Sequence, residues 1–289
     1  MRFLSKTPGL MAATFAATTA GAAMAQDGLE GLDVIGAPRD GAMGFQPAAT
    51  VVARDLQALD GMILVIITAI VIFVTGLLIY VMLRYNKRAN PTPARFTHNA
   101  PLEIAWTLIP VLILVFIGAF SLPVLFKQQE IPDADITIKV TGYQWYWGYE
   151  YVDNGFGFES YMLDRAALEE YGYSQDEYLL ATDNAVVVPS GKNVVVQVTA
   201  ADVIHSWAMP SFGVKQDGVP GRLAEAWFNV DVGNEGIYFG QCSELCGKDH
   251  SYMPITVKVV TQAEYDAWLE RAEARFAGAA QPVTVASND

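Results

Sequence analysis

The stretch Cys242-Ser-Glu-Leu-Cys-Gly-Lys-Asp-His-Ser-Tyr-Met253 contains both cysteines of this 289-residue chain, four residues apart. His250 follows the second cysteine by four residues, and Met253 lies three residues further on. Thiolate, imidazole and thioether groups are all ligands of copper, and their combination favours a soft metal. The stretch therefore predicts a copper site, and the rest of the chain has to supply a fold that positions it.

Two uncharged runs, Gly61–Leu83 and Ile104–Phe126, are each 23 residues long. A helix of that length crosses a bilayer, and the prolines inside the second run are tolerated in membrane helices. The connector between the runs carries four basic residues and, before Glu103 at its end, no acidic one, so the positive-inside rule places it in the cytoplasm. We expect residues 55–127 to form a transmembrane hairpin whose two ends lie on the opposite side of the membrane.

The N-terminal residues 1–25 have the features of a secretory signal. Arg2 and Lys6 precede an apolar run, and Ala23-Met-Ala25 fits a cleavage site that would make Gln26 the mature N-terminus. A flexible Ala/Gly-rich tail is the alternative interpretation. With a signal, residues 26–54 form an exported segment, and the chain lies in the inner (cytoplasmic) membrane of a bacterium with its C-terminal domain in the periplasm.

After Phe126 the hydrophobic period changes from that of a helix to that of a strand. Alternating segments, separated by Gly- and Pro-containing turns, predict an all-β sandwich or Greek-key barrel over residues 128–276. A helix over Gln262–Phe276 begins with a capping box, and residues 277–289 read as a flexible tail. Asp164–Asp183 is an acidic, partly helical surface insertion. The predicted strands are residues 135–143, 185–188, 193–199, 222–229, 236–241 and 255–260.

Charge is distributed unevenly along the chain. Residues 127–289 carry 24 acidic and 10 basic side chains, a net of -14, whereas residues 1–126 carry 7 and 8. An acidic exported domain disfavours a nucleic-acid partner and complements a basic protein partner.

Histidine, which would supply the imidazole ligands, is scarce in this chain. The chain has three, and His98 lies in the cytoplasmic connector, which leaves His205 as the only exported partner for His250. A single blue-copper ion uses one cysteine, two histidines and a weak methionine. This chain offers one thiolate more, and two thiolates can bridge two copper ions. Such a pair shares its charge, favours fast electron transfer, and leaves no coordination position for a substrate.

Other interpretations of these residues remain open on the sequence alone. Two exported cysteines can form a disulfide, and Cys₂His₂ sets can bind zinc, although zinc leaves Met253 unexplained. A lone His205 is more often a structural residue, and Met253 by itself is more often part of a core.

Five motifs, in this order along the chain, resemble cytochrome c oxidase subunit 2 of the bacterial aa3 type. The resemblance covers about residues 50–275, and the copper loop is its most specific part. The motifs are His98-Asn-Ala-Pro-Leu-Glu-Ile-Ala-Trp106, Gly142-Tyr-Gln-Trp-Tyr-Trp-Gly-Tyr-Glu-Tyr151, Asp202-Val-Ile-His-Ser-Trp207, Val214-Lys-Gln-Asp-Gly-Val-Pro-Gly-Arg222 and Gly240–Pro254.

The resemblance implies a two-helix transmembrane hairpin followed by a cupredoxin-like Greek-key barrel with a short C-terminal helix. It implies an enzyme complex that accepts electrons from cytochrome c, passes them to haem a, reduces dioxygen to water and pumps protons. Dioxygen chemistry would lie in subunit 1, and this chain would supply the binuclear copper A centre. Its partners would be subunits 1 and 3, cytochrome c and membrane lipid.

The resemblance also implies roles for individual residues. The copper A ligands would be the backbone carbonyl of Glu244 and the side chains of His205, Cys242, Cys246, His250 and Met253. The Glu244 carboxylate would bind Mg²⁺ or Mn²⁺ shared with subunit 1, and a carboxylate suits such a hard cation.

Trp145 would be the exposed residue that receives electrons from docked cytochrome c. If its strand is regular, alternation places Trp145 and Trp147 on one face. Glu150, Glu159 and Asp202 would be docking acids, although each alone reads as an ordinary solvated acid. Glu103 would mark the mouth of a proton path, or simply favour a helix dipole.

Three related proteins provide rival interpretations. A membrane-anchored copper chaperone also has two cysteines four apart, but it requires alternating strands and helices and lacks the following histidine and methionine. A quinol oxidase subunit of the same fold typically lacks the copper ligands. Nitrous oxide reductase carries a similar loop in a much longer soluble chain.

Overall fold

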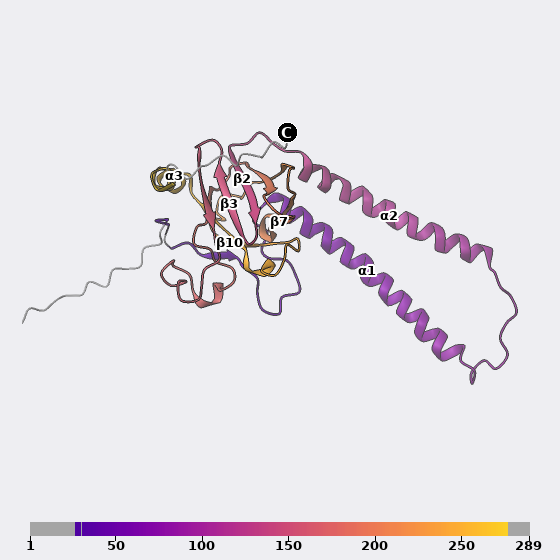
Figure 1. The fold of residues 1–289 in the computed structure, drawn as a ribbon. Helices are drawn as coiled ribbons and strands as arrows, with labels where there is room; N and C mark the ends of the chain where they lie inside the picture. Colours follow the sequence, from indigo (N-terminus) through magenta and orange to yellow (C-terminus); the bar gives the residue numbers. More distant parts are fainter. Residues whose placement is uncertain (1–26, 30, 277–289) are drawn as a thin grey trace, which may run out of the picture.

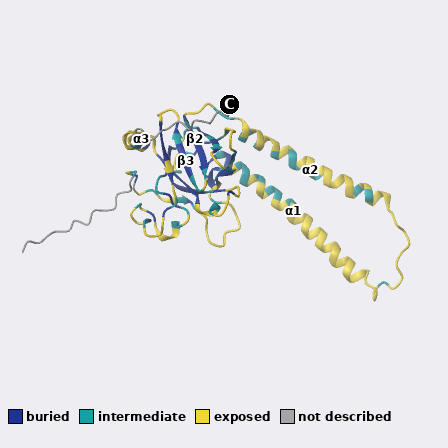
Figure 2. Ribbon diagram, viewed as in Figure 1, coloured by how far each residue is buried: buried dark blue, intermediate teal, exposed yellow. Residues whose placement is uncertain are grey.

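A computed structural model describes residues 27–29 and 31–276, which form a β-sheet domain and a long helical hairpin that projects from it (Figure 1). The predicted signal of residues 1–25 and the predicted tail of residues 277–289 lie outside the described residues. Buried side chains concentrate in the β domain, whereas the hairpin is exposed along most of its length (Figure 2).

The hairpin consists of α1 (Val51–Arg84) and α2 (Ala100–Gln129), and both are long and apolar enough to cross a membrane. Each helix is longer at both ends than the uncharged run that predicted it. The side chains of Thr50 and Asn99 accept hydrogen bonds from the first turns and so define where the helices begin. The absence of charge marks the part that crosses the membrane, whereas a capped helix continues beyond it into water.

Two sheets pack face to face in the β domain. One sheet has the strand order β5-β11-β10-β7-β8, with β1 paired to β10, and the other has the order β4-β3-β2-β6-β9. The first sheet comprises β1 (Val34–Gly36), β5 (Val186–Pro189), β7 (His205–Met209), β8 (Val214–Gly218), β10 (Gly236–Cys242) and β11 (Pro254–Val260). The second comprises β2 (Ile136–Tyr143), β3 (Tyr146–Tyr151), β4 (Phe156–Ser160), β6 (Val194–Ala200) and β9 (Ala224–Phe228).

These strands confirm the predicted all-β domain, and the six strand segments expected from alternation are all present with ends shifted by a few residues. The core between the sheets is largely aromatic and β-branched. The Tyr151 hydroxyl donates to Val187 O at 2.7 Å and accepts from Val187 N at 2.9 Å, which joins β3 to β5 across the two sheets. The C-terminal helix α3 (Gln262–Phe276) begins, as predicted, with a capping box formed by Thr261 and Glu264.

The N-terminal segment contributes a strand to the β domain. Strand β1 runs parallel to β10, with Val34 opposite Ile237 and Gly36 opposite Tyr238. A Cβ atom on Gly36 would lie 2.3 Å from the Tyr238 ring, so this close approach requires glycine. The three residues of β1 show no clear alternation of apolar and polar side chains, so the sequence did not predict this strand. It forms because β10 provides a partner.

The insertion Asp164–Asp183 contains turns and the short 3₁₀ helix η1 (Gln175–Glu177), as its mixed propensity suggested. It is nevertheless more than a surface loop. Leu168 and Tyr173 are buried in a second small core with Ile237 and Phe239 of β10. The prediction missed this core because the insertion's apolar residues follow no regular period.

Contacts at the membrane end fix the hairpin to the β domain. Lys127 of α2 forms an ion pair with Asp55 of α1 at 2.6 Å, and the Trp227 indole donates to Lys127 O at 3.3 Å. Arg54 pairs with Asp231 next to β9. The domain is therefore held at the exported ends of both helices.

Candidate metal centre

The predicted ligands come from three places that the sheet brings together. His205 is the first residue of β7, and Cys242 is the last residue of β10, which pairs with β7 at Trp207. The loop from β10 to β11 carries the other predicted ligands and returns to the same end of the sheet. Antiparallel pairing thus places a histidine beside a cysteine that is 37 residues away in sequence.

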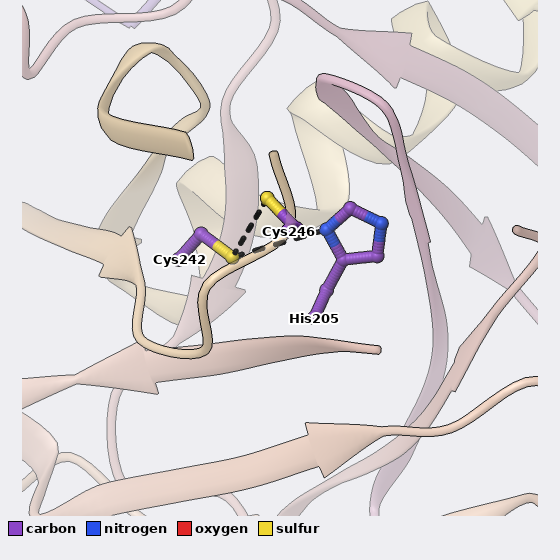
Figure 3. Close-up of side chains that lie close together, drawn as sticks. All are labelled: His205, Cys242 and Cys246. Carbon is purple, nitrogen blue, oxygen red and sulfur yellow. Dashed lines mark hydrogen bonds between the residues drawn. The ribbon is translucent and has the colours of Figure 1, made fainter. Parts of the chain in front are cut away.

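Sulfur and nitrogen atoms converge at this end of the sheet (Figure 3). The Cys242 Sγ lies 3.9 Å from His205 Nδ1 and 3.9 Å from Cys246 Sγ. Cys246 Sγ in turn lies 3.5 Å from His250 Nδ1 and 3.5 Å from Met253 Sδ. Both thiols are free, and the ligand atoms of His205, Cys242 and Cys246 all lie within 4.8 Å of one another, as a shared metal requires.

The predicted ligands differ in how far they are buried. The side chains of His205, Cys242, Cys246 and Met253 are buried, and His250 is half-buried. The side chain of Glu244 is exposed, while its carbonyl oxygen lies 3.4 Å from Cys242 Sγ. The structure therefore separates the backbone of Glu244, which faces the thiols, from its carboxylate, which is available to another molecule.

Asp202 orients His205. Its Oδ1 lies 2.9 Å from His205 Nε2, and its Oδ2 accepts a hydrogen bond from Gln144 N at 2.7 Å. A carboxylate on one imidazole nitrogen directs the other nitrogen towards a metal and makes it a better ligand. The sequence suggested Asp202 only as a docking acid, because nothing in the sequence showed that its side chain turns towards His205.

Trp145 lies in the two-residue turn between β2 and β3, so the alternation that would pair it with Trp147 does not apply. It is half-buried, and its indole nitrogen donates to Cys246 O at 3.2 Å. Gln144 Nε2 donates to the same carbonyl at 2.8 Å. The turn therefore connects the molecular surface directly to the backbone of a thiol residue.

The centre is also shaped by two residues whose roles the sequence did not reveal. A Cβ atom on Gly142 would lie 2.8 Å from the His205 ring, so glycine lets β2 approach the imidazole. Trp147 is fully buried and donates from its indole nitrogen to Met253 O at 3.1 Å. Both residues stand in the motif Gly142–Tyr151, but their roles depend on contacts with distant residues.

The two thiols differ in acidity. Burial opposes ionisation of Cys242, but its contacts with His205 and with backbone groups lower its pKa to about 7. Burial and the neighbouring Cys242 charge raise the pKa of Cys246 to about 12. Burial acts to lower the pKa of His205, yet its contacts with Cys242 and Asp202 raise it overall. The contact between them thus favours the thiolate form of Cys242 and the protonated form of His205.

Acidic and aromatic side chains share the outer face of the second sheet near Trp145. The Tyr146 ring stacks between Tyr143 and Tyr161, with centroid distances of 4.7 and 4.6 Å. The Tyr161 hydroxyl donates to Glu159 at 2.5 Å. Glu150 lies on the same strand as Tyr146 at an even spacing, so it shares that face, where it pairs with Lys139 at 3.3 Å.

Glu103 lies far from this centre, in the first turn of α2 at the end of the hairpin away from the β domain. Its Oε1 accepts a hydrogen bond from Asn99 N at 3.0 Å, and the Asn99 side chain caps the same helix. This contact gives the carboxylate a local structural role, consistent with its favourable position at a helix N-terminus.

We predict that the ultraviolet absorbance of the metal-free chain rises around pH 7 by the amount expected for the ionisation of one thiol. The pKa of Cys242 in the folded state lies below its ordinary value of 9.0. Ionisation of Cys242 therefore stabilises the folded state fully above pH 9, and this stabilisation is lost as the pH falls through about 7. Cys246→Ser should retain this titration and Cys242→Ser should abolish it. A metal-free protein with no absorbance change between about pH 6 and pH 8 would show that His205 does not stabilise the thiolate.

Two family profiles match consecutive parts of the chain. The profile "Cytochrome C oxidase subunit II, periplasmic domain" matches residues 136–260, and "Cytochrome C oxidase subunit II, transmembrane domain" matches residues 38–124. The first contains the whole candidate metal centre, and the second contains most of the hairpin.

Similar proteins agree with these matches. Cytochrome c oxidase subunit 2 of Cereibacter sphaeroides is 61% identical over 275 residues, covering 90% of this chain and 89% of that protein. The Arabidopsis thaliana subunit 2 is 41% identical and covers 78% of this chain and 88% of that protein. A crystal structure of the periplasmic domain of subunit II from Bradyrhizobium japonicum is 51% identical, with a TM-score of 0.45, and covers 50% of this chain and 99% of that one.

A second solved structure is a mixed-disulfide intermediate between a thioredoxin-like protein and subunit II of cytochrome c oxidase. It is 49% identical, has a TM-score of 0.43, and covers 51% of this chain and 96% of that one. The two apolar helices and the matched transmembrane and periplasmic domains make this an inner-membrane protein with two spans. The chain belongs to the cytochrome c oxidase subunit II family.

Proposed function

We propose that this chain is the electron-accepting subunit of a bacterial cytochrome c oxidase, and that His205, Cys242, Glu244, Cys246, His250 and Met253 hold a binuclear copper A centre. The observation that carries this proposal is the pair of free, buried thiols 3.9 Å apart, flanked by two imidazoles and a thioether. No other grouping in the described part of the chain presents so many soft ligands.

The arrangement suits two ions better than one. Cys242 lies beside His205 and the Glu244 carbonyl, whereas Cys246 lies beside His250 and Met253. Each thiol therefore has its own histidine and its own weak ligand. Two ions together would use all six donors, whereas a single four-coordinate ion would leave two of the six without a metal.

Copper bound here would carry one electron at a time between the partner that donates it and the haem of the catalytic subunit. The protein's own residues supply rigidity and exclude water. Asp202 fixes His205, Trp147 fixes the backbone of Met253, and the turn at Gln144 and Trp145 fixes the backbone of Cys246. Ligands held in this way change position little when the charge changes, which favours rapid electron transfer.

We also propose that the Glu244 carboxylate binds Mg²⁺ or Mn²⁺ together with subunit 1. The side chain of Glu244 is exposed, whereas its carbonyl oxygen faces Cys242 Sγ. Both observations support separate roles for the carboxylate and the carbonyl. Oxygen ligands are those that such hard cations prefer. One residue would then link the copper centre to the catalytic subunit.

The outer face around Trp145 is our proposed docking surface for a basic cytochrome c. Trp145 contacts the backbone of Cys246, and the Tyr143, Tyr146 and Tyr161 stack provides a rigid aromatic surface beside it. Tyrosine and tryptophan are frequent anchors of protein interfaces. Glu150 and Glu159 add negative charge, so association should be steered electrostatically and weaken with salt. Subunits 1 and 3 and membrane lipid would surround the exposed hairpin.

The two thiols must be reduced before copper binds. In one similar structure, subunit II forms a mixed disulfide with a thioredoxin-like protein. We propose that a periplasmic thiol-disulfide partner likewise keeps Cys242 and Cys246 reduced in this chain. The rival copper-chaperone function lacks support, because the domain is a two-sheet β sandwich without the alternating strands and helices of a thioredoxin-like fold.

We predict that Trp145→Phe leaves the copper spectrum unchanged but slows electron transfer from reduced cytochrome c at least about tenfold. The substitution removes the indole that donates to Cys246 O and fills less of the turn. Stopped-flow absorbance of the assembled oxidase measures this rate, and Trp268→Phe in α3 is the control. An unchanged rate with Trp145→Phe would exclude Trp145 from the electron path.

The sequence also suggested a proton path that begins at Glu103, which we retain as a proposal. Glu103→Gln is the sharpest test, because the amide oxygen can still accept the hydrogen bond from Asn99 N while the side chain can no longer carry a proton. We expect slower proton uptake by the assembled oxidase, measured with a pH-sensitive dye. Normal uptake would leave Glu103 with only its capping role.

A further inference from the structure

Resting on the docking surface proposed above, we propose that Lys248 limits how tightly a basic electron carrier binds over Trp145. Lys248 stands in the loop between two predicted ligands, Cys246 and His250. It places a positive charge on an otherwise acidic domain, at the point where electrons would enter. Lys248 thereby sets the balance between binding the carrier and releasing it after each transfer.

The loop brings Lys248 to the indole ring of Trp145. A Cβ atom on Gly247 would lie 2.9 Å from Trp145 Cζ2 and 3.2 Å from Nε1, so glycine lets the loop approach the ring closely. The φ angle of Gly247 is +128°, which residues with a side chain rarely adopt. The next residue carries its ammonium group over the ring, with Lys248 Nζ 5.5 Å from the ring centroid. A cation at this distance is attracted to the face of the ring.

The ammonium group of Lys248 is accessible to a partner. The Lys248 side chain is 77% exposed, and Nζ lies 3.5 Å from Oδ2 of Asp249, whose side chain is 41% exposed. An exposed ion pair of this kind is weak, because water and salt screen both charges. A carrier that docks over Trp145 therefore meets the ammonium group itself.

The acids proposed for docking are engaged elsewhere on this face. Asp202 directs one carboxylate oxygen to His205 Nε2 and the other to Gln144 N. Glu150 pairs with Lys139 at 3.3 Å. The face thus attracts a basic carrier at long range, while an exposed cation lies over the indole through which the electron would pass.

Association and release make opposite demands on such a face. Negative charge speeds the encounter with a basic carrier, but close charge complementarity in the final complex slows its departure. A carrier that brings one electron per visit must leave before the next one can bind, and release of the spent partner limits many turnover rates. A like charge at the centre of the contact weakens the final complex, while the surrounding acids still steer the approach.

Steady-state kinetics of the assembled oxidase with a basic, soluble cytochrome c test the role of Lys248. We expect Lys248→Met to lower KM at least about threefold at low salt, because a repulsive charge is lost from the contact. This difference from the unaltered oxidase should shrink at about 0.15 M salt, where the Debye length is about 8 Å. The value of kcat should stay the same or fall, since tighter binding does not speed release.

Two further variants separate the charge of Lys248 from its packing and from the net charge of the domain. Lys248→Arg keeps a cation over the ring and should retain the KM of the unaltered oxidase. Lys192→Met removes another exposed cation, which pairs with Asp135 at 3.3 Å. Asp135 directly precedes β2, whereas Trp145 follows the other end of that strand. Lys192→Met should therefore leave KM unchanged.

Equal KM values for Lys248→Met and the unaltered oxidase at low salt would overturn the inference. A raised KM would overturn it too, because Lys248 would then pair with an acidic group of the carrier. An equal fall in Lys192→Met would do the same, since net charge alone would then decide affinity. The copper spectrum of the same samples separates these outcomes from a failure of the metal centre. An unaltered oxidase that takes no electrons from cytochrome c would overturn the proposed function, and the inference with it.

Discussion

The carbonyl oxygen of Cys246 accepts two hydrogen bonds from the β2–β3 turn, and the metal centre depends on them. Gln144 and Trp145 are both donors, so the loop is held against the β domain by groups that do not bind metal. Without such support, a loop of this length would have to be ordered by the metal itself. A preformed site reduces that cost and also limits movement of the ligands during electron transfer.

The same turn joins the inside of the protein to its surface. Its inner side contacts the loop of the thiols, and its outer side continues into the tyrosine stack and the acidic residues of the second sheet. The hairpin holds this domain at the membrane through Lys127, Asp55 and Arg54. A partner approaching from the periplasm would therefore meet an acidic, aromatic face, while the Glu244 side chain is exposed at the loop of the thiols.

The sequence predicted which side chains converge at the candidate site, and most strands, because these signals are local. Cysteine spacing, strand alternation and uncharged runs can each be read from a short window. It did not predict that Asp202 orients His205, that Gly142 admits the imidazole, or that Asp27 neutralises Lys258. Each of these contacts joins residues through the packing of the fold, and no local pattern records them. The helix ends were also misplaced, because charge marks the membrane boundary and not the last helical turn.

We propose above all that two thiolates hold two copper ions that share one unpaired electron. Metal analysis combined with electron paramagnetic resonance of the purified, copper-loaded chain tests it most directly. We expect two copper ions per chain and a signal in which the electron is coupled equally to two copper nuclei. One copper ion per chain with the spectrum of a single nucleus, or zinc in place of copper, would contradict it.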